Sequence, residues 1–352
     1  MVIRMNYAKP GLAGDTAMKI ICAYPVNVDA VYNVRGEEIS QFTQSGTQSG
    51  PAPKIKSELK RSIGSRDDLI SSLLFCMQQG SGAELLIGSQ ALAEQIEASF
   101  PWQFRLGGNA GIMANVLAAL GSKPILNAPA LGPRLAGMLH PEVGIPVSGI
   151  LKEPSQAAGE PELDKEAMHF VFQFKMGDAV SVPDNRIIAA GDNRFIATYD
   201  PVNTSLKTNT DFNAYCLANA GDFDGALLSG FHLATSEHYQ EIFPQKIAQI
   251  QSWRELNPKM FVHAEMGSFQ SPEIMPYLLP SHPVDSLGFN EDELAVAESS
   301  LLTRLAGNNV SSKTTPKASG TIQSVGSYSR VYSEHHNKRA DKSGRRALCL
   351  DA

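Results

Sequence analysis

The sequence predicts an α/β fold, with a mostly parallel sheet covered by helices and a second, smaller lobe that is rich in strands. Apolar runs of strand length alternate with amphipathic segments of helix length over most of the chain, which is typical of βαβ units. A pattern of alternating apolar and polar residues occupies the middle of the chain. Because 43% of the 352 residues are hydrophobic, the chain can bury a large core and divide into more than one lobe.

The strands and helices of the main sheet are expected in alternating order. The expected strands are 18–24, 124–128, 225–229, 260–265 and 285–289, and the expected helices are 65–79, 107–121, 236–253 and 291–305. The first helix opens with Ser65 and Asp68, which form a capping pattern. The second helix has a predicted apolar face, formed by Ile112, Met113, Val116, Leu117 and Leu120.

The segments that connect and follow these elements differ in composition. Residues 25–30 (PVNVDA) are expected to form the turn that leaves the first strand, because Pro and Asn are frequent in turns. Residues 35–63 are rich in Gly, Ser, Gln and Pro, which predicts an irregular segment. Residues 169–175 (HFVFQFK) place three phenylalanines on one face, and 194–199 follow as a second strand. These two strands are expected to belong to the smaller lobe.

The overall composition excludes several classes of protein. A net charge of -6 argues against a nucleic-acid or anionic-membrane partner, which usually requires a basic balance. The four cysteines, Cys22, Cys76, Cys216 and Cys349, form no CxxC pair, so we expect no structural zinc site and a reducing compartment. No apolar run approaches the ~20 residues that span a bilayer, and no leader pattern is found at the N-terminus. The sequence therefore predicts a cytoplasmic protein.

A glycine-rich segment, 105–111 (RLGGNAG), leads directly into the second helix. Glycines let a ligand approach the backbone closely, and a helix N-terminus offers free N–H groups. A tight turn that needs glycine explains the same pattern equally well. Asn27 and Asp29 follow the first strand, where open α/β sheets bind ligands, and a carboxylate there can accept hydrogen bonds from hydroxyls. Taken alone, an Asx-turn or a helix cap is the better interpretation of that pair.

Two carboxylates near the C-terminal half form a candidate metal site. His263 and Glu265 lie on one face of an expected strand end, because side chains alternate along a strand. Glu293 follows Asn290 at the start of an expected helix, where a carboxylate also suits the helix dipole as a cap. The functional interpretation is that Glu265 and Glu293 hold a hydrated Mg²⁺, which favours one or two carboxylates, waters and phosphates.

In combination, seven segments between residues 20 and 305 are more specific than any one of them. They are CAYPVNVDAV, FRLGGNAGIMANVLA, HFVFQFK, NRFIA, GALLSGFH, FVHAEMGS and VDSLGFNEDELA. In this order they resemble the landmarks of the archaeal ADP-dependent glucokinase/phosphofructokinase family, including its HxE and NxxE metal motifs. The resemblance implies a ribokinase-like three-layer sandwich with a smaller β-rich lid. It also implies transfer of the β-phosphate of ADP to a sugar in modified glycolysis, leaving AMP, with Mg²⁺ as cofactor.

The resemblance also implies a discontinuous domain arrangement. The large domain is expected to comprise 1–30, 105–150 and 200–307, and the lid 31–104 and 151–199. Residues 308–352 are polar and Ser-rich without a sustained period, which predicts a disordered or aberrant tail.

By resemblance, most candidate residues surround a sugar. Asn27 and Asp29 are expected to hold sugar hydroxyls, with Gly108 and Asn109 lining the same pocket. His169 matches a family position near the sugar, although a histidine hydrogen-bonded as an ordinary strand residue is the alternative. Arg194 matches an arginine that faces phosphate, a role that suits a planar guanidinium.

Two further residues bear on the choice of sugar. Glu84 resembles the lid carboxylate that holds glucose, whereas Lys175 would meet the phosphate of fructose 6-phosphate. Glucose, fructose 6-phosphate or both therefore remain open as substrates.

One family motif is not found in this sequence. The GxGD segment, whose aspartate acts as general base in the family, has no counterpart after Asn290. The catalytic aspartate is therefore unassigned, and the sequence predicts a C-terminally truncated version of the fold with weak turnover. The alternatives to an active kinase are a sugar-binding pseudokinase and a truncated gene product.

Overall fold

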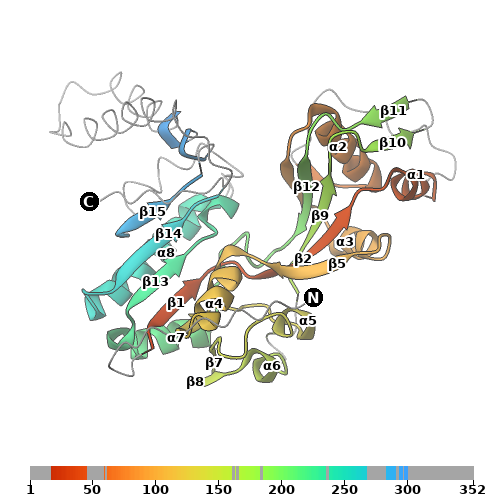
Figure 1. The fold of residues 1–352 in the computed structure, drawn as a ribbon. Helices are drawn as coiled ribbons and strands as arrows, with labels where there is room; N and C mark the ends of the chain where they lie inside the picture. Colours follow the sequence, from red (N-terminus) through yellow and green to blue (C-terminus); the bar gives the residue numbers. More distant parts are fainter. Residues whose placement is uncertain are drawn as a thin grey trace, which may run out of the picture.

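The computed structural model describes residues 17–45, 59, 62–160, 163, 166–182, 185–234, 238–267, 283–290, 293–295 and 297–299. Two β-sheets lie at the centres of two lobes, and the chain passes between the lobes several times (Figure 1). The expected tail, 308–352, lies outside the described residues.

The large sheet has five parallel strands in the order β15-β14-β13-β1-β6. They are β1 Lys19–Ala23, β6 Lys123–Leu126, β13 Gly225–Leu228, β14 Phe261–Glu265 and β15 Ser286–Gly288. Each coincides with a predicted strand to within a few residues. The predicted parallel sheet is therefore confirmed.

Helices cover both faces of this sheet, and the side chains of β1 show how. Ile20 and Cys22 point into a core that includes residues of α4 (Asn109–Ala119). Ile21 and Ala23 point into the opposite core, which includes residues of α7 (Thr210–Ala218) and α8 (Tyr239–Leu256). Because strand residues alternate between faces, one apolar strand supplies both cores, and the large lobe has three layers.

The second sheet is mixed and has six strands in the order β3-β4-β12-β9-β2-β5. They are β2 Asn27–Asn33, β3 Ser62–Ile63, β4 Ala83–Ile87, β5 Gln103–Gly107, β9 Met168–Phe174 and β12 Asn193–Tyr199. Three helices pack against it: α1 Gly36–Ser45, α2 Arg66–Gln79 and α3 Gln90–Glu97 (Figure 1). Phe170, Phe172 and Phe174 are all buried in this core, as their alternation predicted.

Short elements complete the described part of the chain. They are α5 Pro133–Ala136, β7 Ile145–Val147, β8 Ile150–Lys152, α6 Pro154–Ala157, β10 Ala179–Val182, β11 Asn185–Ile188, η1 Ala220–Asp222 and η2 Phe231–Leu233. No helix within the described ranges combines the length and the apolar character that a membrane crossing requires.

The turn predicted at 25–30 is wrong. Only Tyr24, Pro25 and Val26 separate the two strands, and Asn27 already begins β2. The chain therefore leaves the large sheet and enters the centre of the second sheet almost without a loop. Pro and Asn suggested a turn, but burial of Val28 and Ala30 between neighbouring strands outweighs that local preference.

The irregular segment predicted at 35–63 is wrong at its start, which forms α1. Ile39 and Phe42, three residues apart on this helix, are buried against the second sheet. Residues 46–58 lie outside the described part of the chain. Tertiary burial therefore stabilises a helix whose Ser, Thr and Gln residues gave only a weak local signal.

The buried face predicted for α4 is also wrong, because the helix turns most of these apolar residues to the exposed side. Ile112, Val116 and Leu120 are exposed, whereas the buried positions are the small residues Ala110, Gly111, Ala114 and Ala118. A Cβ atom on Gly111 would lie only 2.6 Å from the side chain of Val26. The helix therefore lies so close to the sheet that only small side chains fit beneath it.

Two of the predicted domain boundaries fall within strands of the second sheet. Residue 30 falls inside β2 and residue 105 falls inside β5, and both strands belong to the second sheet. The boundary predicted at 199/200 coincides with the end of β12.

Lys246 on α8 is a cation buried in the large lobe. Its ammonium group donates a hydrogen bond to Thr208 and lies 4.7 Å from the ring centroid of Tyr24. None of the described carboxylates forms an ion pair with it. Burial lowers the pKa of Lys246 from 10.5 to about 8, because the charged form loses its hydration.

We predict that Lys246 makes stability depend on pH between about 8 and 10.5. The pKa is lower in the folded than in the unfolded chain, so the unfolded chain binds more protons in this window and stability rises with pH. Between pH 7.5 and 10.5, wild type should gain about 3 kcal/mol in unfolding free energy relative to Lys246→Met, as measured by urea unfolding.

The matched control is Lys259→Met, because Lys259 is exposed. Its difference from wild type should stay constant over the same pH range. A constant difference for Lys246→Met as well would contradict a buried, destabilised ammonium.

Candidate functional site

The predicted site begins where the chain crosses from the large sheet to the second sheet. Asn27 is fully buried at the start of β2, and its side-chain N–H donates to Asp29 Oδ1 at 2.7 Å. Gly107 pairs with Asn27 on the neighbouring strand, and a Cβ atom there would collide with both side chains. Glycine at 107 therefore makes room for the Asp29 carboxylate.

The next two residues of the glycine-rich segment, Gly108 and Asn109, lie on the large-lobe side of the site. Gly108 has a φ of 76°, and a Cβ atom there would lie 2.5 Å from the carbonyl oxygen of Pro25. Asn109 then begins α4, and its side chain donates to Ser229 Oγ at 3.1 Å. The tight-turn interpretation is thus correct for Gly108, and the turn brings Asn109 to the same crossing point as Asn27.

Three strands of the second sheet place polar side chains in one row. Asp29 on β2 is in register with His169 on β9, which is in register with Thr198 on β12. The hydroxyl of Thr198 donates to Glu84 Oε1 at 2.7 Å, and His169 Nδ1 lies 4.0 Å from the same oxygen. The sheet register therefore brings Asp29, His169 and Glu84 to one face.

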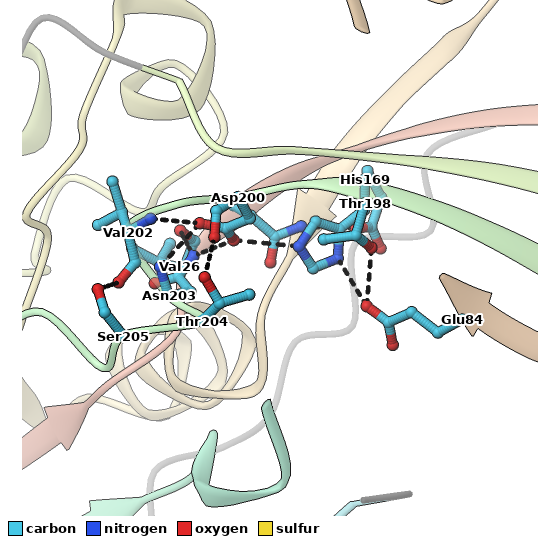
Figure 2. A network of polar contacts seen from close by, with 11 residues as sticks. Val26, Glu84, His169, Thr198, Asp200, Val202, Asn203, Thr204 and Ser205 are labelled. Atoms are coloured by element: carbon cyan, nitrogen blue, oxygen red, sulfur yellow. Dashed lines mark hydrogen bonds and ion pairs between the residues drawn. The ribbon is translucent and has the colours of Figure 1, made fainter. Parts of the chain in front are cut away.

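A buried aspartate, Asp200, fixes the histidine of this row (Figure 2). Its Oδ1 accepts the backbone N–H groups of Val202 and Asn203, and its Oδ2 accepts the Asn203 side chain at 2.6 Å. The same Oδ2 lies 3.1 Å from His169 Nε2. Asn203 also donates to the carbonyl of Val26, so the network reaches the crossing between the sheets.

Asp200 was not predicted from the sequence. It follows the last residue of β12 and precedes Pro201, so an Asp-Pro turn signal at a strand end could have drawn attention to it. The alternative considered for His169, a hydrogen-bonded strand residue, describes the contact with Asp200 correctly. It does not exclude a ligand at Nδ1.

The surrounding carboxylates keep His169 charged. Burial opposes the charged form and is the largest single effect on its pKa, but the hydrogen bond and charge of Asp200 oppose burial. Two nearby carboxylates, Glu84 and Asp29, add to the effect of Asp200. Together they raise the pKa of His169 to about 9, so the imidazole is a cation at neutral pH.

For Asp29, the effect of burial on the pKa outweighs that of its neighbours. Burial raises its pKa above the ordinary value, and the charge of Glu84 adds to this. The charge of His169, the hydrogen bond from Asn27 and the charge of Arg194 lower it. A half-buried carboxylate that is only partly compensated is suited to accept hydrogen bonds from an incoming ligand.

A cavity of about 850 Å³ lies at the far end of the same sheet. Arg35, Lys175 and Arg194 line it, together with Asp178 and Asp192. Both aspartates accept backbone N–H groups of the turn after β9, at 2.7–2.8 Å. Neither Lys175 nor Arg194 has a side-chain ion pair with any described residue, so their charges are available to an anion.

The candidate metal residues lie at the carboxyl edge of the large sheet. Glu265 ends β14, and its Oε2 is 3.3 Å from His263 Nε2. Glu293 accepts hydrogen bonds from the backbone and side-chain N–H groups of Asn290, at 2.9 and 2.7 Å. The capping role considered for Glu293 is therefore present.

The donor set at this edge fits a weakly held Mg²⁺ and does not fit a dedicated metal cage. No group of three or more His, Cys, Asp or Glu residues gathers in the described ranges in a way that could hold a metal ion. Mg²⁺ commonly uses one or two carboxylates, with waters and substrate phosphates completing its shell. Glu265 and Glu293 meet that requirement in number and type of donor.

The chain matches a known protein family over most of its length. The conserved region of the ADP-specific phosphofructokinase/glucokinase family matches residues 18–347. The chain belongs to this family. Its fold is the ribokinase-like α/β fold that the resemblance implied, and the family match includes every predicted site residue.

Individual relatives are distant and longer than this chain. An ADP-specific phosphofructokinase of Methanosarcina acetivorans is 26% identical over 293 residues, which are 78% of this chain and 58% of that protein. An ADP-dependent glucose/glucosamine kinase of Pyrococcus abyssi is 25% identical over 283 residues, covering 78% of this chain and 60% of that protein. The chain thus spans less than two thirds of the length of both relatives.

A solved structure gives the same result for the fold. The last common ancestor of ADP-dependent phosphofructokinases from Methanosarcinales superposes with a TM-score of 0.64 at 25% identity. The superposition covers 85% of this chain and 64% of that one.

We predict that His169 remains protonated at pH 7 and loses its proton near pH 9, as followed by its ring signals in NMR. In Asp200→Asn the pKa should fall by more than one unit, because burial then acts without its main opposing charge. The folded pKa lies above the unfolded value of 6.5, so the stability that His169 contributes is complete below about pH 6.5 and is lost as pH rises through about 9.

Asp211→Asn is the control, because Asp211 binds the backbone of Ser148 and has no contact with His169. An unchanged His169 pKa in Asp200→Asn would show that Asp200 does not hold the imidazolium.

Proposed function

We propose that this chain is an ADP-dependent sugar kinase that transfers the β-phosphate of ADP to a sugar hydroxyl and releases AMP. The observation that carries the proposal is the pair of buried Asn27 and half-buried Asp29, on one face of the second sheet with Glu84 and His169. Family membership supports the same activity, and the named relatives are ADP-specific phosphofructokinases and ADP-dependent glucose/glucosamine kinases.

The sugar-binding role follows from the chemistry of these groups. Asp29 accepts two hydrogen bonds from neighbouring hydroxyls, as a carboxylate with two oxygens can. The charge of His169 lowers the pKa of Asp29 against the effect of burial. Its Nδ1–H faces the ligand, while its Nε2–H donates to Asp200. The second sheet with its helices serves as the lid, and Gly108 and Asn109 close the pocket from the large lobe.

Glu265 and Glu293 hold a hydrated Mg²⁺ that joins the protein to the phosphates of ADP. The bound ion supplies charge neutralisation for the transferring phosphoryl group. Arg194, on the second sheet, is the candidate residue that faces phosphate, and no described carboxylate forms an ion pair with its guanidinium. The general base is not assigned to any residue, because no GxGD aspartate is found in the sequence.

The sugar-binding pseudokinase considered at the outset receives no support from the comparisons over the kinase. Both named relatives are kinases by name, and the family match extends beyond the metal motifs to residue 347. The two proposals differ in one measurable product, AMP.

We expect AMP to form when the chain is incubated with ADP, Mg²⁺ and either glucose or fructose 6-phosphate. Asp29→Asn should lower kcat/KM by about 10–100-fold, because a charge-assisted hydrogen bond is replaced by a neutral one that cannot accept at both positions. A coupled assay for AMP measures both values.

Asp222→Asn serves as the matched control, since Asp222 pairs with Lys19 at the opposite edge of the large sheet. Sugar binding without AMP formation would replace the kinase by the sugar-binding alternative. Equal kcat/KM for Asp29→Asn and wild type would remove Asp29 from the site.

The substrate specificity is proposed to include both sugars. Glu84 supports binding of glucose, because a carboxylate accepts from hydroxyls and would repel a phosphate. The cavity lined by Lys175 and Arg194 supports binding of a sugar phosphate, because these cations have no partner among the described side chains.

We predict that two single changes separate the substrates. Lys175→Gln should raise KM for fructose 6-phosphate by about 10-fold and leave glucose unaffected, because only the former carries a phosphate. Glu84→Gln should raise KM for glucose by a similar factor. Steady-state assays with both sugars measure the split, with exposed Lys123→Gln as control; parallel changes for both sugars would contradict it.

A further inference from the structure

One polar side chain at the carboxyl edge of the large sheet has no role so far. His232 lies in η2, the 3₁₀ turn that follows β13, between the buried anchors Phe231 and Leu233. Gly230 opens this turn with a φ of 95°, which brings the chain sharply back beside Pro25. His232 is thereby placed at the same edge of the sheet as the end of β14, beside the crossing between the lobes.

The imidazole of His232 packs against Gly267, and only a glycine fits at that position. A Cβ atom on Gly267 would lie 2.7 Å from both Cε1 and Nδ1 of the ring, closer than real Cβ contacts allow. Any other residue at 267 would displace the imidazole. The ring is therefore held in position by packing, although no hydrogen bond from a described residue holds it.

Both ring nitrogens lack hydrogen bonds to the described part of the chain. Nδ1 is buried and has no partner. Nε2 is not among the buried atoms, and the side chain as a whole keeps an open fraction, so Nε2 is the nitrogen that a ligand can reach. Polar groups in such positions are usually satisfied in native proteins, which points to a partner that arrives with the ligand.

The charges around His232 show which region it faces. Among the groups that act on the ring, Glu84 is the strongest, followed by His169 and then Glu265. The first two belong to the second sheet and the third to the large sheet, so charged groups of both lobes act on the ring. Burial lowers the pKa of His232 to about 4, and the ring is neutral at pH 7.

We propose that His232 is a sugar-contacting residue that donates a hydrogen bond from Nε2 to an oxygen of the sugar, on the side opposite Glu84. This inference rests on the proposed sugar-kinase function and adds a residue to its binding site. The negative charge of Glu84, which acts on the ring, disfavours a phosphate at this position, and Mg²⁺ prefers oxygen ligands to imidazole. A sugar hydroxyl can donate a hydrogen bond to the Glu84 carboxylate and accept one from the Nε2–H of His232 at the same time.

The test uses three variants of the full chain and calorimetric titration with glucose and with fructose 6-phosphate, without nucleotide. His232→Leu should weaken binding of the sugar by about 10-fold. His232→Gln should restore most of the affinity, because its amide nitrogen reaches the position of Nε2. His232→Asn should not, because its amide reaches only the position of Nδ1.

A second readout does not depend on affinity. The ¹⁵N shifts of His232 in wild type should change when sugar binds, and the melting temperatures of the three sugar-free variants should not follow their order of affinity. Equal sugar affinity in wild type and His232→Leu would overturn this inference while leaving the proposed function intact. Equal loss in the Gln and Leu variants would also overturn it, since the ring would then act through packing.

Failure of the proposed function has a different signature. If wild type binds neither sugar, both proposals fail together. If wild type binds sugar and Asp29→Ala does not, the sugar site stands, and the three His232 variants alone decide this inference.

Discussion

The site depends on one buried carboxylate. Asp200 is 3% exposed and lies where the second sheet ends and the chain returns to the large lobe. Removing a carboxylate from water is costly unless hydrogen bonds replace its hydration, and three N–H donors together with His169 do so here. Because Asn203 also donates to Val26, the same network ties the return of the chain to its first crossing.

This constraint determines the electrostatics of the cleft. Asp200 holds His169 as a cation, and that cation offsets the neighbouring charges of Asp29 and Glu84. The row still has more carboxylates than cations, so it suits a neutral polyol whose hydroxyls can donate. An anionic group is better placed near Lys175 and Arg194, further along the same face, where the nearby aspartates are occupied by backbone N–H groups. The sheet thus separates a carboxylate-rich row from a cation-lined cavity along its length.

Elements with strong periodicity could be predicted from the sequence. The strand at 169–175 was recognisable because three phenylalanines alternate on one face, and α2 because Ser65 caps it by accepting from the Asp68 N–H. The outward face of α4 was not predictable, because helical periodicity shows that apolar residues gather but not how near the sheet lies. That distance is set by Gly111 against Val26, a contact between residues far apart in the sequence.

Some residues of the site could likewise be predicted from the sequence, and others could not. Asn27, Asp29, Glu84 and His169 were available from the sequence only through combined motifs and a family resemblance. Their convergence depends on sheet register, which local patterns do not encode. Asp200 and His232 were missed because each is a single polar residue beside a turn, with no spacing that distinguishes it from many others.

The position of the site follows from how the two lobes are connected. Tyr24, Pro25 and Val26 join β1 to β2, while Gly108 alone joins β5 to α4 directly beside them. Two short connections cannot move independently when a Cβ atom at Gly108 would already overlap Pro25. Under the proposed function, Asp29 and Asn109 contact the sugar from the two lobes at this crossing. Glu84 lies on β4, further along the second sheet and away from both connections.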